Sequence, residues 1–477
     1  MITTDFAADP DFARQYIEAN LDKRQVNKIQ HSFPSPRYWQ EEEIDCDTIL
    51  EDRARLREMG QPKAINLYLG VPYCLKTYPA KCGYCLFPVE DFVGHGELDV
   101  YFGYLKREAE MYKRFFDGEH LESVYFGGGT SNLYKAPRYL ELMEIVRDIF
   151  PVAESGASIT LEGIPQLFTR EKIEYIKAAG MNRISMGAQQ LNPELNKASG
   201  RKQTAEQVFN AIGWAKEYGL ACNVDLIFGW PNQTVATMVK DLEDLIATGI
   251  HDITHYELNV GGPTDFALNR YHELPSTLEN LEMYRVSRDL LQSHGFKQVT
   301  AYNWRKPGDP ASKDYEEGAA RRFDTAATLG MGYAALSFLG DVSIADSGFW
   351  SLMNCRDLTR YKASIDAGRL PVERGFHHEP EDFRLSALFR NLFVLEVSRE
   401  AYRAAFGVDV YEEFADVWTA LEERDFVRVS PEKIEVVGDG IFYTPMIQTL
   451  LAQKRYRVLR EWVKRSRNSQ LPVFSGN

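Results

Sequence analysis

Several features that the sequence lacks narrow its class. Six cysteines in 477 residues are too few for a disulfide scaffold. No run approaches the roughly 20 consecutive apolar residues that a membrane span needs, and the N-terminal residues show neither the basic nor the apolar region of a secretory signal. We therefore expect a cytoplasmic protein without a membrane span.

An excess of positive charge is also missing. The chain has 55 Lys and Arg against 69 Asp and Glu, a net charge of -14. A duplex-binding protein usually needs a basic field to neutralise phosphates, so nucleic acid is not the expected partner. The basic stretch 454–467 does not change this, because its apolar residues recur at helical spacing and indicate a solvated terminal helix.

Hydrophobic residues make up 44% of the chain, which is the usual share in a globular protein. Short β-rich runs alternate with helical patterns, and the strand candidates are 65–70, 123–127, 158–163, 182–187, 223–229 and 252–258. Six strand–helix units predict a parallel sheet with right-handed crossovers. Because six units are fewer than the eight of a closed barrel, we expect an α/β fold built on a partial (β/α)6 barrel.

Changes in composition and in predicted secondary structure divide the chain into four regions. Residues 1–60 form a polar, irregular N-terminal segment that covers the active site, 61–300 the partial barrel, and 301–378 an extension and connector. Residues 379–477 form a C-terminal helical module of winged type. Its stretch 425–444 predicts a β-hairpin around Pro431 and Glu432.

Function collects at the C-terminal ends of the strands in a parallel barrel. Here five consecutive strand ends carry thiol, glycine or polar groups: Cys74, Cys82 and Cys85; Gly127 to Thr130; Glu162; Gln189 with Arg201 twelve residues later; and Asp225 with Gly229, Trp230 and Pro231. We expect these groups to share one rim of the barrel.

Three clustered thiols leave three interpretations open. A zinc site would need a fourth ligand, for which His95 is the nearest histidine although its spacing fits no zinc pattern. The thiols could instead be structural. A [4Fe–4S] cluster held by Cys74, Cys82 and Cys85 would leave one iron open to a chelating ligand, and we favour this hypothesis.

The other rim residues suggest what that ligand is. A glycine turn such as Gly128-Gly129 lets backbone N–H groups approach a ligand closely, and Arg201 offers a planar fork for a carboxylate. Either Asp225 or Glu162 can accept hydrogen bonds from ribose hydroxyls. An amino acid, a ribose and an open iron together indicate S-adenosylmethionine.

The chain resembles the radical S-adenosylmethionine enzymes of the oxygen-independent coproporphyrinogen III oxidase family. The matching runs are YLGVPYC (68–74), CGYC (82–85), VYFGGGT (124–130), SITLEGIPQ (158–166), NRISMGAQQL (182–191), GRKQT (200–204), NVDLIFGWPNQT (223–234) and LGMGYAALSFLG (329–340). Together with the region after residue 380 they cover roughly 400 residues.

This resemblance implies specific roles. Three cysteines, Cys74, Cys82 and Cys85, would ligate the cluster. The cofactor site would comprise Tyr68, Tyr84, Gly128, Gly129, Thr130, Glu162, Gln189, Arg201 and Asp225. A flavodoxin or ferredoxin type of electron donor is implied, and members of the family also tend to bind a second S-adenosylmethionine.

Two departures from the family pattern concern the loops. The cysteines are spaced C-x7-C-x2-C where the family has C-x3-C-x2-C, so four extra residues lengthen the cluster loop. The family's E-A-N-P motif is here Glu162-Gly163-Ile164-Pro165. We expect the cluster and cofactor sites to persist, whereas the substrate does not transfer with them.

Three functions follow for a small-molecule substrate. The first is oxidative decarboxylation of coproporphyrinogen III. The second, which we favour slightly, is radical methyl transfer or cyclopropanation with two S-adenosylmethionines, on a tetrapyrrole or a natural product. The segment HSFPSPR (31–37), followed by Trp39, faintly resembles the N-terminal stretch of anaerobic heme-degrading methyltransferases, which keeps a tetrapyrrole substrate open. The third is a heme-binding chaperone. The remaining cysteines, Cys46, Cys222 and Cys355, are expected to be small buried hydrophobes rather than ligands of an auxiliary cluster.

Overall fold

The computed structural model describes residues 11–24, 29–41, 44–58, 64–116, 119–150, 156–307, 327–340 and 349–469. The first ten residues of the predicted N-terminal segment and much of the predicted connector, 308–326 and 341–348, lie outside the described residues. Within the described ranges, no helix is both long and apolar enough to cross a membrane.

A twelve-stranded sheet forms the centre of the molecule, in the order β14-β13-β12-β11-β1-β4-β5-β6-β7-β8-β10-β9. All six predicted strands are found, as β1 (Ala64–Val71), β4 (His120–Gly128), β5 (Ser158–Gly163), β6 (Arg183–Gln189), β7 (Ala221–Phe228) and β8 (Asp252–Glu257). Each adjacent pair is parallel. The predicted α/β fold with a parallel sheet is therefore confirmed, and the sheet order runs from β14 to β9 without closing.

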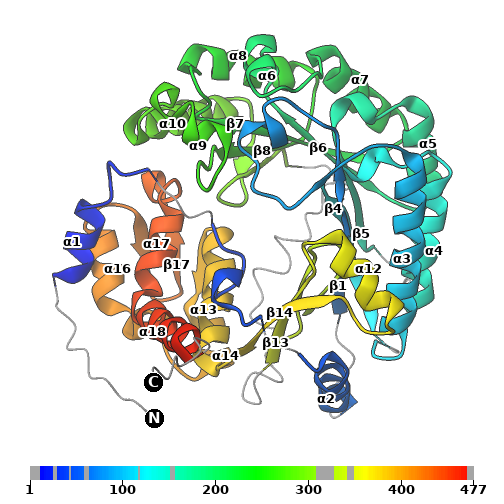
Figure 1. Cartoon of the computed structure of the whole chain (residues 1–477). Helices are drawn as coiled ribbons and strands as arrows, with labels where there is room; N and C mark the ends of the chain where they lie inside the picture. The colour runs from blue at the N-terminus through cyan, green and yellow to red at the C-terminus, as the bar shows by residue number, and fades with distance from the viewer. Residues whose placement is uncertain are drawn as a thin grey trace, which may run out of the picture.

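Helices follow the strands along the outer side of the curved sheet (Figure 1), and they are α3 (His95–Lys113), α4 (Arg138–Ile149), α5 (Arg170–Ala178), α6 (Pro193–Ala198), α7 (Ala205–Glu217) and α8 (Val235–Ala247). Their inner faces are buried, as the spacing of apolar residues predicts. In α3, for example, Leu98, Tyr101 and Leu105 are each at most 1% exposed. These faces and the strands share one large apolar core.

A seventh parallel strand extends the sheet beyond the predicted barrel. This strand, β11 (Ala327–Gly332), pairs with β1 on the side opposite β4. From β11 the sheet continues antiparallel through β12 (Leu336–Phe338), β13 (Phe349–Asn354) and β14 (Val372–His378). At the other edge it ends with the short strands β10 (Asn303–Arg305) and β9 (Lys297–Gln298).

The part of the N-terminal segment that the structure describes contains two α-helices where an irregular chain was expected. Helix α1 (Phe12–Glu18) buries Ala13 and Ile17 in the core of the C-terminal module. Helix α2 (Cys46–Glu58) buries Leu50 against the main core. Polar sequences such as these form helices here because contacts with other parts of the chain stabilise them.

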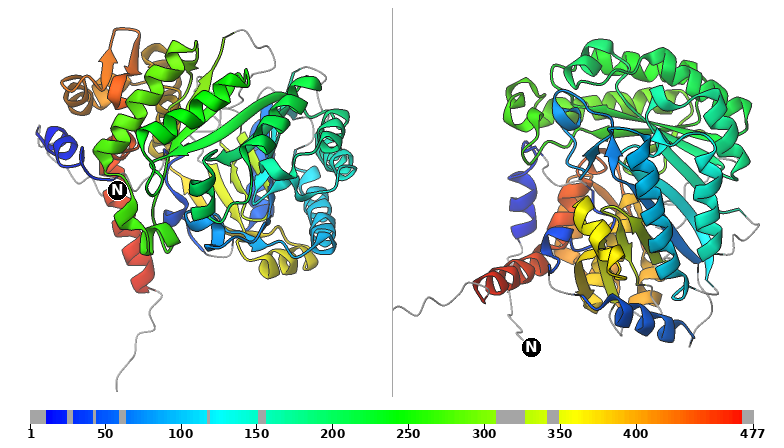
Figure 2. Two further views of the ribbon diagram at one scale, coloured as in Figure 1. Left: turned by 90° about the horizontal axis from the view of Figure 1, so that it is seen from above. Right: turned by 45° about the vertical axis from the view of Figure 1, so that its right-hand side comes forward.

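The C-terminal module combines helices with a small antiparallel sheet. Strands β16 (Val427–Val429) and β17 (Lys433–Val436) form the predicted hairpin, and β15 (Glu396–Ser398) pairs with β17 on its other side. The helices are α13 (Pro380–Phe393), α14 (Arg399–Phe406), α15 (Val410–Glu413), α16 (Ala415–Glu422), α17 (Thr444–Leu451) and α18 (Gln453–Ser469). Figure 2 shows the end of α18 extending away from the rest of the chain.

The prediction that the terminal helix is solvated is only partly correct. Tyr456 and Leu459 of α18 are 1% and 4% exposed, because they pack with the aromatic residues of the N-terminal segment and of α13.

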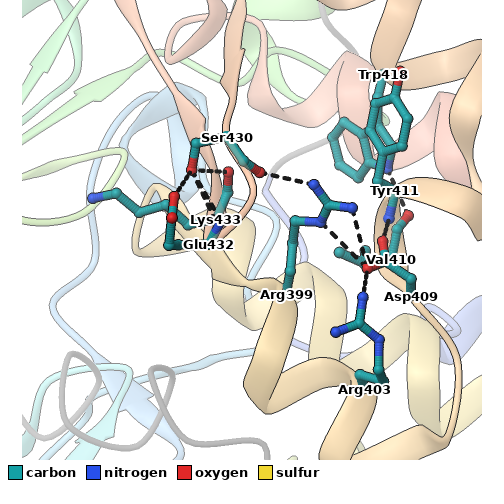
Figure 3. Close-up of polar contacts among 9 residues, drawn as sticks. All are labelled: Arg399, Arg403, Asp409, Val410, Tyr411, Trp418, Ser430, Glu432 and Lys433. Atoms are coloured by element: carbon teal, nitrogen blue, oxygen red, sulfur yellow. Dashed lines mark hydrogen bonds and ion pairs between the residues drawn. The ribbon is translucent and has the colours of Figure 1, made fainter.

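A buried carboxylate connects the elements of this module (Figure 3). Asp409 accepts hydrogen bonds from Arg399 at 3.2 Å, from Arg403, and from the N–H of Tyr411 at 2.8 Å. Arg399 also donates to the carbonyl of Ser430 at 2.9 Å, next to the hairpin turn. Burial alone would raise the pKa of Asp409, but the Tyr411 N–H and the Arg399 guanidinium hold it below its usual value.

Candidate active site

One cavity of about 430 Å³ lies where the parallel strands end at their carboxyl side. All twelve residues predicted for the cluster and the cofactor line it: Tyr68, Cys74, Cys82, Tyr84, Cys85, Gly128, Gly129, Thr130, Glu162, Gln189, Arg201 and Asp225. The residues come from strand ends that are far apart in the sequence. The parallel sheet brings them together because all of these strands point the same way.

The loop with the three thiols is bracketed by a small parallel pair, β2 (Tyr73–Cys74) and β3 (Glu90–Asp91). Inside it, Lys81 and Cys82 adopt the left-handed conformation, with φ of 52° and 56°. Non-glycine residues rarely adopt this conformation, and it concentrates at functional sites. The hydroxyl of Thr77, within the lengthened part of the loop, accepts the Cys82 N–H at 2.9 Å.

Each of the three sulfur atoms has a hydrogen-bonding neighbour: the Thr130 hydroxyl lies 3.3 Å from Cys74 Sγ, Arg201 Nη1 lies 3.7 Å from Cys82 Sγ, and the Phe87 N–H lies 3.4 Å from Cys85 Sγ. Such donors stabilise negative charge on ligating sulfur. Burial raises the pKa of the Cys74 thiol, and the Thr130 hydroxyl opposes this rise.

The donor set fits a cluster of several irons better than a single ion. Among the described residues, no three histidine, cysteine or acidic side chains are grouped so that they could hold one metal ion. His95 begins α3, packs against Phe92 with ring centroids 5.5 Å apart, and does not line the cavity. A [4Fe–4S] cluster takes its thiolates at separate irons, whereas the zinc hypothesis loses its fourth ligand.

The glycine turn at the end of β4 differs from the expectation that its amides face a ligand, because the amide of Gly129 is already used. Gly128 has φ +107°, and a Cβ there would lie 2.5 Å from the carbonyl oxygen of Val71. A Cβ on Gly129 would lie 2.4 Å from the carbonyl oxygen of Tyr73. The Gly129 N–H already donates to the Val71 carbonyl at 2.7 Å. These glycines therefore let β4 approach the strand that carries Cys74, and the Gly129 amide is not free for a ligand.

Two carboxyl groups line the cavity close to each other. Burial, reinforced by the nearby charge of Asp225, raises the pKa of Glu162 to about 8. Glu162 therefore holds a proton at neutral pH and can donate as well as accept a hydrogen bond. A neutral acid beside a carboxylate suits a diol such as a ribose, whose hydroxyls also do both.

Arg201 is half-buried and is held on several sides. Its Nε donates to Gln203 Oε1 at 2.9 Å, and its Nη2 donates to the carbonyl of Gly187. Because these contacts fix the plane of the guanidinium, the group is oriented before any ligand binds.

Tyr84 lies between Cys82 and Cys85 in the thiol loop. It packs against Trp230, which the sequence also places at the end of a strand. The ring centroids of Tyr84 and Trp230 are 4.9 Å apart at an angle of 62°. Trp230 itself is fully buried and does not line the cavity. It therefore supports the site from behind and has no direct access to a ligand.

Sequence reasoning missed part of the lining. His255, Tyr256 and Glu257 lie at the end of β8, and the strand-end rule would have found them had it been applied to the sixth strand. Other lining residues come from outside the barrel: His31, Tyr302, Ile441, Phe442 and Pro445. No local pattern marks these, because packing between distant segments brings them to the cavity.

The remaining cysteines lie in two places. Cys46 and Cys355 line a second cavity together, whereas Cys222 lies on β7 in the main sheet. Burial raises the pKa of Cys46 and of Cys222 to about 12. These thiols are therefore protonated. Cys46 and Cys355 are buried as expected of small hydrophobes, whereas Cys222 is only half-buried.

Several known proteins are similar to this chain in sequence. Residues 79–245 match the model of the Radical SAM superfamily, a range that includes Cys82 and Cys85. The oxygen-independent coproporphyrinogen III oxidase of Pseudomonas aeruginosa is 26% identical over 399 residues, which are 80% of this chain and 84% of that protein. The heme chaperone HemW of Haemophilus influenzae is 29% identical over 254 residues, 51% of this chain and 63% of that protein.

The same fold is found in a solved structure. Coproporphyrinogen III oxidase from Escherichia coli superposes with a TM-score of 0.76 at 22% identity, covering 90% of this chain and 99% of that one. Residues 79–245 thus contain a Radical SAM domain, and the chain is homologous to the oxygen-independent coproporphyrinogen III oxidases. Its cofactors are those of the superfamily, a [4Fe–4S] cluster and S-adenosylmethionine.

Proposed function

We propose that this chain abstracts hydrogen from an organic substrate held in the cavity beside its cofactors. One observation carries the proposal: the three thiols and the nine cofactor residues expected from the sequence line a single cavity. When bound, the cluster and S-adenosylmethionine supply a 5′-deoxyadenosyl radical by reductive cleavage of the sulfonium.

The side chains of the cavity bind and orient these groups. Cys74, Cys82 and Cys85 hold three irons, each sulfur supported by its hydrogen-bonding neighbour. Arg201 would donate to the cofactor carboxylate from guanidinium N–H groups that its contacts with Gln203, Cys82 and Gly187 do not use. Glu162 and Asp225 bind the ribose.

Segments from both ends of the chain close off part of the cavity. His31 of the N-terminal segment and Phe442 of the C-terminal module both line the cavity. A radical would abstract hydrogen from other molecules if solvent and solutes entered freely, so this closure protects the reaction. Electrons would come from a flavodoxin or a ferredoxin.

The fate of the substrate is the finer part of the proposal. The homologous oxidases support oxidative decarboxylation of a porphyrinogen propionate. Methyl transfer or cyclopropanation, which the sequence slightly favours, finds no support among these relatives. A heme chaperone is the third candidate, since one relative is named as such.

Anaerobic turnover of the reduced, reconstituted protein with coproporphyrinogen III tests these candidates. An oxidase releases carbon dioxide and 5′-deoxyadenosine without S-adenosylhomocysteine. Substrate-dependent formation of S-adenosylhomocysteine would instead establish methyl transfer. Binding of heme without formation of 5′-deoxyadenosine or S-adenosylhomocysteine would establish a chaperone. The Cys82→Ala variant is the control for background cleavage. Absence of any 5′-deoxyadenosine in the reduced, cluster-loaded protein would contradict the proposed function itself.

A further inference from the structure

A smaller cavity of about 240 Å³ adjoins the main one among the parallel strands. Tyr68, Glu162, Asp225 and Tyr256 line both cavities. We call the smaller cavity the polar chamber, because the rest of its lining is also polar: Tyr125, Arg183, Ser185, Asn223, Thr254 and Asn303. Bulky apolar residues usually fill the inside of a parallel barrel. The polar side chains found here therefore call for a role beyond packing.

Four hydrogen bonds lead along the chamber to Asp225. The Thr300 hydroxyl donates to Asn303 Oδ1 at 2.7 Å, and Asn303 Nδ2 donates to Thr254 Oγ1 at 3.1 Å. The Thr254 hydroxyl donates to Asn223 Oδ1 at 3.0 Å, and Asn223 Nδ2 donates to Asp225 Oδ1 at 2.7 Å. We call the first four of these residues the hydrogen-bond relay.

The direction of the relay is fixed at both of its ends. An ionised carboxylate only accepts hydrogen bonds, so Asn223 presents its NH₂ group to Asp225 and its carbonyl to Thr254. At the other end, Thr300 Oγ1 accepts two backbone N–H groups at 2.9 and 3.2 Å, so its own hydrogen is left for Asn303. Every donor therefore points toward Asp225, and bonds aligned in this way polarise one another.

The relay is buried and the sheet holds it in place. Asn223, Thr254 and Thr300 are each at most 2% exposed. Asn223 lies opposite Ser185 of β6 in the sheet register, and its Nδ2 also donates to Ser185 Oγ at 3.1 Å. Buried polar groups are costly unless they are satisfied, and a satisfied network is rigid. The relay thus offers a fixed N–H to a carboxylate that reaches the main cavity.

We infer that Asn223 is a positioning residue, which with the relay behind it sets the direction in which the Asp225 carboxylate faces the ribose hydroxyls of S-adenosylmethionine. A carboxylate held in this way is oriented before the ligand binds, so less freedom is lost on binding. A network that only joined the strands would leave the contribution of a single ribose hydroxyl unchanged. The inference rests on the proposed function, in which Asp225 binds the ribose.

The test compares S-adenosylmethionine with its 2′-deoxy and 3′-deoxy analogues on the cluster-loaded, unreduced protein, with Kd measured by anaerobic isothermal titration. We expect the wild type to bind at least one deoxy analogue about tenfold more weakly, the factor for one good hydrogen bond. Asn223→Leu is close in size and cannot donate, so it should remove most of this preference. Thr254→Val deletes the relay hydroxyl with little change in shape and should weaken the preference, whereas Thr254→Ser keeps the hydroxyl and should retain it.

Ser123→Ala is the matched control. The Ser123 hydroxyl donates to Asn66 Oδ1 at 2.6 Å, which is the same kind of bond between two buried residues but lies outside the relay. This variant should keep the wild-type preference, and thermal unfolding checks that all variants fold. If Asn223→Leu does not fold, Thr254→Val and Thr254→Ser decide. A preference unchanged in Asn223→Leu or in Thr254→Val, or lost equally in Ser123→Ala, would overturn the inference.

Failure of the proposed function gives a different result. In Asp225→Ala the preference should disappear, because the carboxylate itself is gone. If Asp225→Ala keeps the preference, or if the wild type binds all three compounds equally, the proposed role of Asp225 at the ribose fails and the inference fails with it. If Asp225→Ala loses the preference and Asn223→Leu keeps it, only the positioning role of Asn223 fails.

Discussion

The side-chain amide of Gln448 bonds both backbone groups of Gln30. Gln448 Oε1 accepts the Gln30 N–H at 2.8 Å, and Gln448 Nε2 donates to the Gln30 carbonyl at 2.9 Å. Ser386 does the same for Phe33, accepting its N–H at 2.7 Å and donating to its carbonyl at 2.9 Å. Side chains of the C-terminal module thus hold the N-terminal segment as a neighbouring strand would, and His31 lies between these two anchors.

Gln448→Ala should loosen this segment. The change removes both bonds to Gln30 and a third, to the carbonyl of Phe389 at 3.1 Å. We expect a loss of about 2–3 kcal/mol in the free energy of unfolding, from roughly 1 kcal/mol for each bond, and faster amide hydrogen exchange in residues 29–34. The control is Gln292→Ala, which changes an exposed residue of α10 (Thr277–Ser293). Unchanged exchange in 29–34 would show that these bonds do not hold the segment.

Removing any one thiol of the loop should abolish the cluster. After anaerobic reconstitution we expect about four irons and four sulfides per chain, and neither in Cys74→Ala, Cys82→Ala or Cys85→Ala. Iron and sulfide analysis together with visible absorption measures this. Cys222→Ala, which changes a half-buried thiol outside the cavity, should retain the full content. Iron that survives all three loop changes would refute the assignment.

Arg201→Lys should weaken binding of S-adenosylmethionine. Lysine keeps the charge and loses the planar fork that Gln203 and Gly187 orient. The expected loss is about 1–3 kcal/mol, the range for hydrogen bonds to charged groups. Anaerobic isothermal titration measures it, and Arg170→Lys, in an exposed ion pair, serves as the control. An affinity equal to that of the wild type would remove Arg201 from the site.

Glu108 should make the stability of the fold depend on pH. This buried carboxyl of α3 accepts hydrogen bonds from the Gly332 N–H at 2.8 Å, Asn354 Nδ2 at 2.7 Å and the Tyr361 hydroxyl at 2.6 Å. Burial outweighs these bonds and raises its pKa from 4.5 to about 7. The folded state therefore keeps a proton that the unfolded state releases, so this stabilisation is complete below pH 4.5 and is lost as the pH rises through 7.

Denaturant unfolding between pH 5 and 8 checks this prediction. One extra bound proton corresponds to about 1.4 kcal/mol for each pH unit, so Glu108 alone should account for a decline of about 3 kcal/mol. Glu108→Gln does not titrate, and its stability should fall less with pH than that of the wild type. Glu110→Gln, exposed on the same helix, should follow the wild type. Parallel curves for Glu108→Gln and the wild type would show that this carboxyl does not titrate in the range.

Much of the barrel could be predicted from the sequence because its signals are local. A strand or a helix face is encoded by the spacing of apolar residues within ten or twenty positions, and all six expected strands were found at their places. The rule that parallel strands end at one edge then pointed to ten of the twelve predicted residues that line the cavity, and the family resemblance added Tyr68 and Tyr84. The pairing of β11 with β1 had no such signal, because it joins segments more than 250 residues apart.

The sequence by itself determined the parallel sheet, the thiol loop and most of the residues predicted to line the main cavity, since each depends on a short pattern and a general rule of topology. Only the tertiary structure decided what closes and shapes the rest of the cavity. The Gly129 amide is used by Val71, and the place of His31 depends on how Gln30 and Phe33 are held from the far end of the chain. These contacts depend on packing between remote segments, and no periodicity in the sequence records such packing.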